Sequence, residues 1–492
     1  MTRPPFARLA CGAACLLAAG VAGAAGPPAP PNVIVVLVDD MGSRDLSCQG
    51  SGFYETPHID RLAASGMRFT QGYSACTVCS PTRASLMTGL WPARLRITDW
   101  IPGHRRPRAR LLPPDWTQRL PLETTTVAER LRAAGYATAS IGKWHLGGPD
   151  FYPEHQGFDA NVGGCDRGQP PSFFAPYKIA TLPDGPAGEY LTDREAAEAV
   201  AFITANRDRP FFLYLPLHAV HMPIQAKPEV TAKYAAKDAP GLRPRNDAYA
   251  AMVEGVDDAV GRILATLDDL GIRDRTAIFF TSDNGGLATV TDNRPLRAGK
   301  GSAYEGGVRV PLFVAWPGVT QPGTTSDVPV ITPDIPATIL ARTGLAEADA
   351  LHRVAGLDGR DLSPALAGGT LDREELAWHY PHYHPGGATP HSAIRAGSWR
   401  LVHFYEDGRE ELYDLTADPG ETTDLAASRP EVAAPLRRRL DAVLEQCAAQ
   451  RPVPNPDHAP DRQTKPTPNA GRPAPPSTPP NVLFLLAHGL GK

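Results

Sequence analysis

Three long runs of apolar residues, rich in β-branched and aromatic side chains, are the clearest structural signal along the chain. They cover Asn32–Val38, Arg209–Leu217 and Thr276–Phe280. A continuous apolar run of this length is typical of a strand that is buried on both faces of a parallel sheet. Such strands need helices on both faces to cover them, so the pattern predicts an α/β protein.

Helix signals lie between these runs. Thr56 and Pro57 predict the start of one helix, and Gly66 predicts its end. After Asn246, apolar residues recur every three or four positions as far as Gly271, which indicates a long amphipathic helix. Strands that alternate with helices predict a large, mixed, mostly parallel central sheet sandwiched by helices.

The hydrophobic pattern changes from about Leu371 onward. Short alternating runs at Trp399–Phe404 and Glu411–Leu415 indicate antiparallel strands, and Pro435 is expected to open a helix. Cys447 shares the apolar face of that helix, which favours packing over reactivity. We therefore predict a small C-terminal α+β subdomain, a four-stranded antiparallel sheet with one helix on it.

Both ends of the chain carry distinct signals. Arg3 and Arg8 precede the apolar stretch Leu9–Val21 and then small residues, the layout of a cleaved secretory signal. That stretch is shorter than a membrane span requires. We therefore expect an exported protein, periplasmic or extracellular, without stable membrane insertion.

Residues 451–480 contain 11 prolines in 30 positions, which predicts a disordered or polyproline segment. Residues 481–492 repeat the pattern of the opening strand, either as a truncated second copy or as a chance apolar tail. The expected segments are a signal peptide at 1–25, a large domain at 26–370, the subdomain at 371–450, the Pro-rich linker at 451–480 and the strand-like remnant at 481–492.

Composition narrows the function classes. The 492 residues carry 49 Lys and Arg against 53 Asp and Glu, a net charge of −4, and no basic run stands out. A nucleic-acid partner is therefore not expected. Five of the seven cysteines lie beyond the signal sequence, an odd number for an oxidising compartment. Cys76 and Cys79 form a C-x-x-C pair, which alone would suggest redox chemistry.

Two polar pairs follow the predicted strands. Asp39 and Asp40 come directly after the first strand, and Asp283 and Asn284 follow the third. The carboxyl ends of parallel strands meet at one edge of a sheet, where ligands bind. Four oxygen donors favour a hard cation, so we expect Ca²⁺ at this edge, with Mg²⁺ as the other possibility.

The segment from Cys79 to Gly89, with sequence CSPTRASLMTG, is the sharpest chemical signal. Pro81 suits the first turn of a helix, so Cys79 should lie at a helix N-terminus, which favours an anion. Arg83, four residues on, falls on the same helix face. The segment resembles the maturation motif C-x-P-x-R of the sulfatase family, in which a maturation enzyme oxidises the cysteine to formylglycine.

Further segments are similar to sulfatase motifs in the expected order. Lys143 and His145 lie in G-K-W-H-L-G, His221 lies in H-x-x-H-x-P, and Lys300 precedes E-G-G-x-R-V-P. The resemblance runs from about residue 32 to about 425, and Asp424 departs from it by replacing the usual Asn. It implies that the large domain is catalytic and that the protein hydrolyses sulfate monoesters.

The family mechanism assigns roles to these residues. It implies metal ligation by Asp39, Asp40, residue 79, Asp283 and Asn284. Residue 79, as an aldehyde hydrate, would attack sulfur with help from Asp283 in its deprotonation, and His145 would then take the proton that lets the intermediate collapse. It implies charge stabilisation of the hydrate and the sulfate by Arg83 and Lys143, with His221 and Lys300 at the sulfate and the leaving oxygen.

Substrate identity rests on a loop rich in aromatic and imidazole groups. His382 and His384 lie in the segment WHYPHYHPGG at 378–387, and residues 97–104 provide further contacts. Aromatic faces and neutral donors suit a sugar ring. We therefore expect a sulfated glycan, with galactose or N-acetylgalactosamine sulfate as candidates, and His382 and His384 as substrate-binding residues unless their role is structural.

Two other functions are compatible with the same residues. A phosphonate or phosphodiester hydrolase of the wider alkaline-phosphatase-like superfamily would use the same metal-binding edge. A catalytically silent glycan-binding protein would result if Cys79 were never oxidised. The state of residue 79 and the preferred leaving group separate these alternatives from a sulfatase.

Overall fold

The structure is a computed structural model that describes residues 1–2, 30–347 and 353–458. The predicted export signal, beyond its first two residues, and the predicted remnant at 481–492 lie outside the described residues. The export of the protein therefore stays a prediction. Within the described ranges, no helix is both long and apolar enough to cross a bilayer.

An eight-stranded sheet forms the centre of the molecule, in the order β10-β2-β9-β8-β1-β7-β5-β6. Its strands are β1 (Asn32–Val38), β2 (Met67–Phe69), β5 (Ala137–Ile141), β6 (Ala160–Val162), β7 (Phe211–Pro216), β8 (Thr276–Ser282), β9 (Leu312–Ala315) and β10 (Thr324–Ser326). All neighbours are parallel except β9, which runs antiparallel to both β8 and β2. The three apolar runs are the three central strands β7, β1 and β8, so the prediction of a mixed, mostly parallel sheet is confirmed.

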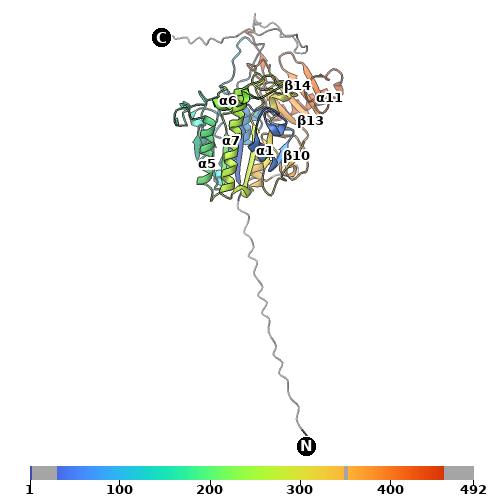
Figure 1. The fold of residues 1–492 in the computed structure, drawn as a ribbon. Helices are drawn as coiled ribbons and strands as arrows, with labels where there is room; N and C mark the ends of the chain where they lie inside the picture. The colour runs from blue at the N-terminus through green and yellow to red at the C-terminus, as the bar shows by residue number, and fades with distance from the viewer. Residues whose placement is uncertain (3–29, 348–352, 459–492) are drawn as a thin grey trace.

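Helices cover this sheet in two groups. The first contains α1 (Pro57–Ala64), α5 (Leu191–Ala205), α6 (Pro228–Ala235) and α7 (Asp247–Asp269), and Figure 1 shows α5, α7 and α1 side by side on one face. The second contains α2 (Cys79–Thr88), α4 (Val127–Ala133) and α9 (Asp334–Arg342), which pack against one another. Short helices complete the large part: α3 (Pro92–Leu95), α8 (Glu305–Val308), α10 (Ser363–Leu366), η1 (Ser47–Gln49), η2 (Pro149–Phe151), η3 (Pro153–His155) and η4 (Arg273–Arg275).

The C-terminal part is a second, smaller sheet. It contains β12 (Leu376–Tyr380), β13 (His391–Ala396), β14 (Trp399–Phe404) and β15 (Glu410–Asp414), all antiparallel. Helix α11 (Pro430–Gln446) packs Leu440 and Leu444 against Leu401 of the sheet. The helix begins one turn and a half before Pro435, because Pro430 has the same favourable φ for a first turn. The predicted subdomain is therefore present, and its boundary at residue 370 stays a prediction.

Two small ribbons join distant segments. One pairs β3 (Gly72–Tyr73) with β11 (Val330–Ile331), and the other pairs β4 (Leu111–Leu112) with β16 (Val453–Pro454). Val453 and Pro454 thus form a short strand within the segment predicted to be disordered or polyproline, and Pro454 is tolerated because it lies at the edge of a two-stranded ribbon. The part of that Pro-rich segment after residue 458 lies outside the described residues.

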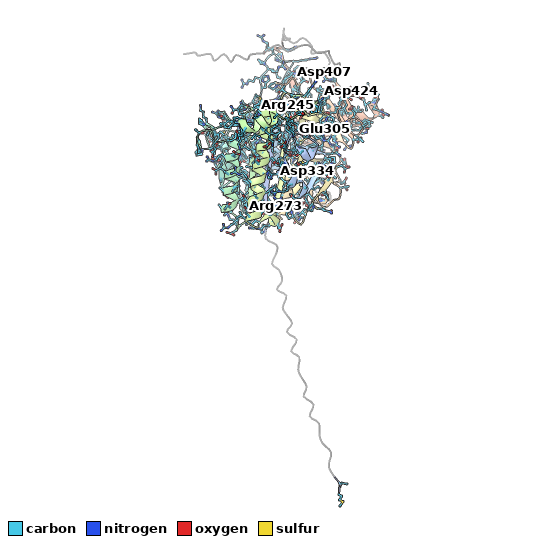
Figure 2. The ribbon with its side chains drawn as sticks, in the orientation of Figure 1. Arg245, Arg273, Glu305, Asp334, Asp407 and Asp424 are labelled. Atoms are coloured by element: carbon cyan, nitrogen blue, oxygen red, sulfur yellow. The ribbon has the colours of Figure 1, made fainter. Side chains whose placement is uncertain are left out.

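A buried ionic cluster lies between the two sheets. Arg400 donates to Glu305 Oε1 at 3.0 Å and approaches Glu421 Oε1 at 3.2 Å, and all three side chains are fully buried. Glu421 Oε2 also accepts a bond from the backbone N–H of Glu305 at 2.7 Å. Figure 2 shows Glu305 below the C-terminal part, which carries Asp407 and Asp424. We call Glu305, Arg400 and Glu421 the boundary cluster.

The structure shows whether Cys76 and Cys79 form the redox pair that their C-x-x-C spacing alone would suggest. All five described cysteines, at positions 48, 76, 79, 165 and 447, are free. Burial raises the pKa of the Cys76 thiol to about 12, so that thiol stays protonated at neutral pH. The C-x-x-C spacing therefore does not form a redox pair in this structure.

Candidate active site

The site lies at the carboxyl ends of the neighbouring strands β1 and β8. Val38 of β1 pairs with Ser282 of β8, so the residues that follow, Asp39 and Asp283, lie beside each other at the same edge. Asp40 has a left-handed backbone with φ of 63°, and its N–H donates to Asp283 Oδ1 at 3.2 Å. All of these carboxylates are buried. The strand register thus collects the predicted acidic residues in one place.

Three cations neutralise these three carboxylates. Lys143 Nζ lies 2.6 Å from Asp39 Oδ2, and Lys300 Nζ lies 2.6 Å from Asp40 Oδ1. The third cation is Arg83, whose guanidinium pairs with Asp283 Oδ2 at 2.8 Å. We call Asp39, Asp40, Asp283, Arg83, Lys143 and Lys300 the active-site cluster.

The geometry of this edge fits a divalent cation. One ligand atom from each of Asp39, Asp40 and His221 lies within 4.8 Å of the other two. The buried oxygens Asp39 Oδ1 and Asn284 Oδ1 accept no hydrogen bond. A buried acceptor without a partner is costly, and a hard cation bound by oxygens removes that cost. Asn284 Nδ2 donates to Asp40 Oδ1 at 2.8 Å, which turns the amide oxygen away from Asp40.

The surroundings shift the pKa values of two carboxyl groups in the cluster in opposite directions. Burial and the nearby charge of Asp39 raise the pKa of Asp283 to about 6. Burial alone would also raise the pKa of Asp40, but Lys300 and His221 outweigh it and hold that pKa well below the usual range. Carboxyl groups whose pKa values are strongly shifted within one cluster are typical of a functional site.

Cys79 is the first residue of α2, and every residue of that helix is buried. The structure thus places the cysteine inside the first turn, with Val78 as the N-cap, one position further in than the sequence suggested. Burial raises the pKa of the Cys79 thiol, so an unmodified thiol here is a poor nucleophile.

His145 contacts Cys79 directly. Its Nδ1 lies 3.5 Å from Cys79 Sγ, and its Nε2 contacts the backbone carbonyl of Ile101. A carbonyl can only accept, so the proton of the neutral ring is on Nε2 and Nδ1 is an acceptor that faces residue 79. Burial and Lys143 hold the pKa of His145 well below its ordinary value, which keeps the ring neutral.

His221 and Lys300 form a second pair on the other side of Asp40. Lys300 Nζ lies 3.2 Å from His221 Nε2, and His221 Nδ1 lies 3.0 Å from the carbonyl oxygen of Met222. That carbonyl requires the proton on Nδ1, so Nε2 accepts from Lys300. Both side chains are slightly exposed, at 13% for His221 and 10% for Lys300.

A cavity of about 610 Å³ opens onto these groups. Of the predicted residues, Cys79, His145, His221, Lys300 and His384 line it. Asp39, Asp40, Asp283, Asn284, Arg83 and Lys143 lie beneath it, fully or almost fully buried. The structure therefore brings every predicted catalytic and metal-ligating residue into one connected cluster below a single opening.

His382 lies elsewhere. It is 2% exposed, does not line the cavity, and its Nε2 lies 2.8 Å from Thr98 Oγ1. Its other ring nitrogen is 3.8 Å from Asp99, which accepts a bond from Tyr380. The structure thus places His382 in the wall behind the loop at 97–104, where it supports that loop and does not reach a ligand in the cavity.

Several cavity residues carry no sequence signal. Asp166, Arg167 and Gln169 line the opening on a loop whose sequence matches no motif. Trp100 also lines the cavity, as expected of the 97–104 segment. Loop positions of this kind can be identified from proximity in three dimensions, since neither periodicity nor spacing marks them.

Comparisons with known proteins agree with this geometry. A family model described as Sulfatase matches residues 31–345, and one described as N-sulphoglucosamine sulphohydrolase, C-terminal, matches residues 299–450. Human arylsulfatase A is 34% identical over 87% of this chain and 91% of its own length. N-acetylgalactosamine-6-sulfatase from Canis lupus familiaris is 36% identical over 81% of this chain and 77% of its own length.

Solved structures give the same answer. The crystal structure of Ps i-CgsB superposes with a TM-score of 0.71 at 29% sequence identity, covering 84% of this chain and 93% of that protein. A second structure of the same protein, in complex with k-i-k-neocarrahexaose, superposes with a TM-score of 0.70. Sequence and structure agree over most of the chain: it belongs to the sulfatase family and is a sulfuric ester hydrolase.

Proposed function

We propose that this protein removes sulfate from galactose or N-acetylgalactosamine units of a sulfated glycan. The observation that carries the proposal is the single opening in which Cys79, His145, His221 and Lys300 meet above the carboxylate-rich strand ends. A sulfate monoester is an anion, and a divalent cation added to this charge-balanced edge would supply the positive charge that offsets it.

The proposed nucleophile derives from Cys79. Oxidation by a formylglycine-generating maturation enzyme converts the thiol to an aldehyde, whose hydrate offers two hydroxyl groups. One hydroxyl gives up its proton with help from Asp283 and attacks sulfur, the S–O bond to the alcohol breaks as the leaving oxygen takes a proton, and the sulfate remains on the side chain. Loss of a proton from the other hydroxyl breaks the C–O bond to sulfate, releases sulfate and restores the aldehyde, and addition of water to the aldehyde re-forms the hydrate without hydrolysis at sulfur.

Asp39, Asp40, Asp283 and Asn284, together with residue 79, are the residues that would hold the divalent cation. Ca²⁺ is the best match for this oxygen-only donor set, and when bound it supplies positive charge for the sulfo group and the attacking hydroxyl. Arg83 fixes the position of Asp283 and also donates to the carbonyl oxygen of Lys143 at 2.8 Å. It therefore ties the helix that carries residue 79 to the strand ends.

Proton transfer is assigned from hydrogen bonds. His145 Nδ1 is an acceptor that faces residue 79, so His145 takes the proton from the second hydroxyl. Lys300 Nζ donates to Asp40 and to His221 Nε2, and it lines the cavity. Lys300 is therefore placed to give a proton to the leaving oxygen, and His221 orients the ammonium group.

The glycan preference rests on the walls of the cavity and on two relatives. Trp100 and His384 provide an aromatic face and an imidazole, which suit a sugar ring. One relative is named for N-acetylgalactosamine-6-sulfate, and Ps i-CgsB has been crystallised with an oligosaccharide. These two observations support a sulfated sugar as the group that enters the opening.

The test combines protein chemistry with a substrate panel. Mass analysis of the peptide containing residue 79, from protein of the native host, should show formylglycine. Sulfate release should then have a higher kcat/KM on monosulfated galactose or N-acetylgalactosamine than the hydrolysis of an aryl phosphodiester has. An intact thiol without any sulfate release would overturn the proposal, and faster phosphodiester cleavage would replace it with the phosphodiesterase alternative.

A further inference from the structure

A second hollow, separate from the catalytic cavity, is lined by three arginines. Arg44, Arg68 and Arg309 line a space of about 470 Å³ that shares no lining residue with the cavity above Cys79. No carboxylate lines this space among the described residues. We call it the arginine hollow.

The positive charge of the hollow is largely unneutralised. Arg68 donates to the backbone carbonyl of Cys48, and Arg309 donates through Nε and Nη2 to the carbonyl of Thr70. Carbonyl oxygens orient a guanidinium without cancelling its charge. Arg309 also lies 3.4 Å from Glu305, but that carboxylate is shared with Arg400 at 3.0 Å.

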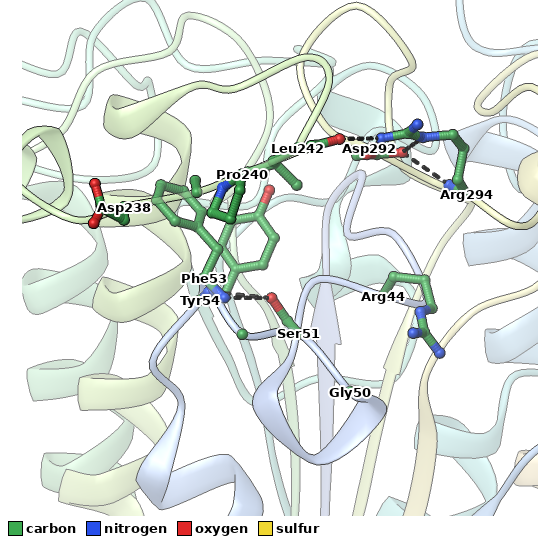
Figure 3. Close-up of a pocket in the computed structure, with 13 residues that line it drawn as sticks. Arg44, Gly50, Ser51, Phe53, Tyr54, Asp238, Pro240, Leu242, Asp292 and Arg294 are labelled. Atoms are coloured by element: carbon green, nitrogen blue, oxygen red, sulfur yellow. Dashed lines mark hydrogen bonds and ion pairs between the residues drawn. The ribbon is translucent and has the colours of Figure 1, made fainter.

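Arg44 has no hydrogen-bond or ion-pair partner among the described residues. It is exposed, and its Nη2 lies 3.2 Å from where a Cβ on Gly50 would be, so the guanidinium lies close over that glycine. Figure 3 shows Arg44 beside Gly50, with no dashed line to any neighbour. Its five N–H donors are therefore available for a ligand.

A neighbouring hollow is a natural comparison. It has about 380 Å³ and shares Arg44 and Gly50 with the arginine hollow. Its other arginine, Arg294, is paired with Asp292, as the dashed lines in Figure 3 show, and Asp238 also lines it. Positive charge is thus balanced on one side of Arg44 and in excess on the other.

The arginine hollow also contacts the segments that carry the active site. Its walls include Ser43, three residues after Asp40, and Leu296, four residues before Lys300. A ligand in the hollow would therefore bridge the two segments on which the Asp40 and Lys300 ion pair depends.

We propose that the arginine hollow is a second anion site, which binds a tetrahedral oxyanion: inorganic sulfate or phosphate, or a sulfo group carried on a glycan chain. Guanidinium groups bind such anions through paired N–H donors with a rigid geometry. Three of them around one space, with no competing carboxylate in the lining, match the charge of such a ligand. Only the glycan form of the ligand rests on the proposed function.

The first experiment locates the anion. Crystals of the full-length Cys79→Ala protein are soaked in selenate, whose anomalous scattering marks its position. Selenate between Arg44, Arg68 and Arg309 supports the proposal. Selenate that occupies only the catalytic cavity, or no selenate at all, overturns it.

The second experiment measures affinity in the same Cys79→Ala background, where the titrated sugar is not consumed. Inorganic sulfate and a sulfated oligosaccharide are titrated separately into this protein and into the same protein with Arg44→Gln and Arg68→Gln. We expect the double substitution to weaken binding at one site by at least about tenfold. Arg44→Gln alone, which removes no structural contact, should give a smaller loss in the same direction.

Arg294→Gln is the matched control, because it removes the same charge from the adjacent hollow. It should change anion affinity by less than about twofold, since Arg294 is already paired with Asp292. Loss of binding for sulfate alone assigns the site to the free anion, and a greater loss for the sulfated oligosaccharide assigns it to the glycan. Equal effects of all variants would overturn the proposal. Because no turnover is measured, failure of the glycan hydrolase assignment leaves this result intact.

Discussion

Two buried ionic clusters lie in the same chain and serve different ends. The active-site cluster balances three carboxylates with three cations and lies directly beneath a cavity of about 610 Å³. The boundary cluster places Arg400 between Glu305 and Glu421 in a fully buried setting between the two sheets. Both clusters therefore bury charged groups. Only the active-site cluster lies beneath a cavity that a substrate can enter, whereas the boundary cluster is closed to solvent and holds the two sheets together.

The largest effect that tests this comparison is loss of the nucleophile. Cys79→Ala should lower kcat by more than about 10⁴-fold, because the side chain that forms the covalent intermediate is removed. Cys76→Ala, three residues away and equally buried, is the control and should retain activity. Sulfate release measured on one sulfated sugar checks both. Residual activity of Cys79→Ala within tenfold of the natural protein would contradict the assignment.

The next effect concerns stability and the boundary cluster. Arg400→Met should lower the free energy of unfolding by about 3–5 kcal/mol, because two buried carboxyl groups lose their cation. Arg429→Met breaks a pair with Glu431 in which both side chains are exposed, and it should cost at most about 1 kcal/mol. Urea unfolding of the two variants gives the comparison, which fails if their losses are equal.

Calcium should stabilise the protein through the active-site cluster and not through the boundary cluster. Ca²⁺ at about 100 times its dissociation constant should raise the free energy of unfolding by about 2.7 kcal/mol. Asn284→Ala should shrink this gain, since it removes a buried oxygen that accepts no hydrogen bond. The Arg400→Met protein should keep the gain in full. Thermal unfolding with calcium and with a chelator provides the measurement, and an unchanged gain in Asn284→Ala would argue against this edge as the metal site.

A pH dependence of the boundary cluster gives a further test. Burial raises the pKa of Glu421 to about 8 despite Arg400, and the charge of Glu305 adds to this increase. The folded protein then holds a proton that the unfolded chain releases near pH 4.5, so stability should fall as pH rises from about 4.5 to 8.

The slope from this group is at most about 1.4 kcal/mol per pH unit. Glu421→Gln keeps the shape of the side chain and cannot titrate, so its unfolding free energy should lack this component. Urea unfolding at pH 5, 6.5 and 8 measures the difference between the two proteins. A parallel pH profile for both would show that Glu421 is ionised throughout the range.

The central sheet could be predicted from sequence because its strands are buried on both faces. Continuous apolar runs marked β1, β7 and β8, and the polar residues after β1 and β8 marked the site. Even the departure at Asp424 is understandable, because its Oδ1 accepts bonds from the N–H groups of Leu412 and Ala426, as an Asn oxygen would.

Other features depend on contacts that a linear pattern does not encode. His382 and His384 are two residues apart and look equivalent in sequence, yet only His384 lines the cavity. The start of α11 was misplaced because two prolines satisfy the same local rule. Arg167 joins the catalytic cavity from a loop distant in sequence, and the arginine hollow is formed by residues from several separate segments. Only the folded chain brings these residues together.

The ribbon of β4 and β16 gives the end of the described chain an anchoring role. Asn455 donates through its side chain to the carbonyls of Pro107 and Ala109, and its backbone N–H bonds to Arg110. These partners follow the segment at 97–104 that forms one wall of the catalytic opening. A shortened protein ending at residue 450 would keep every reactive group but lose the contacts that hold this rim in place. We therefore expect its KM for a bulky sugar to rise while its kcat changes less.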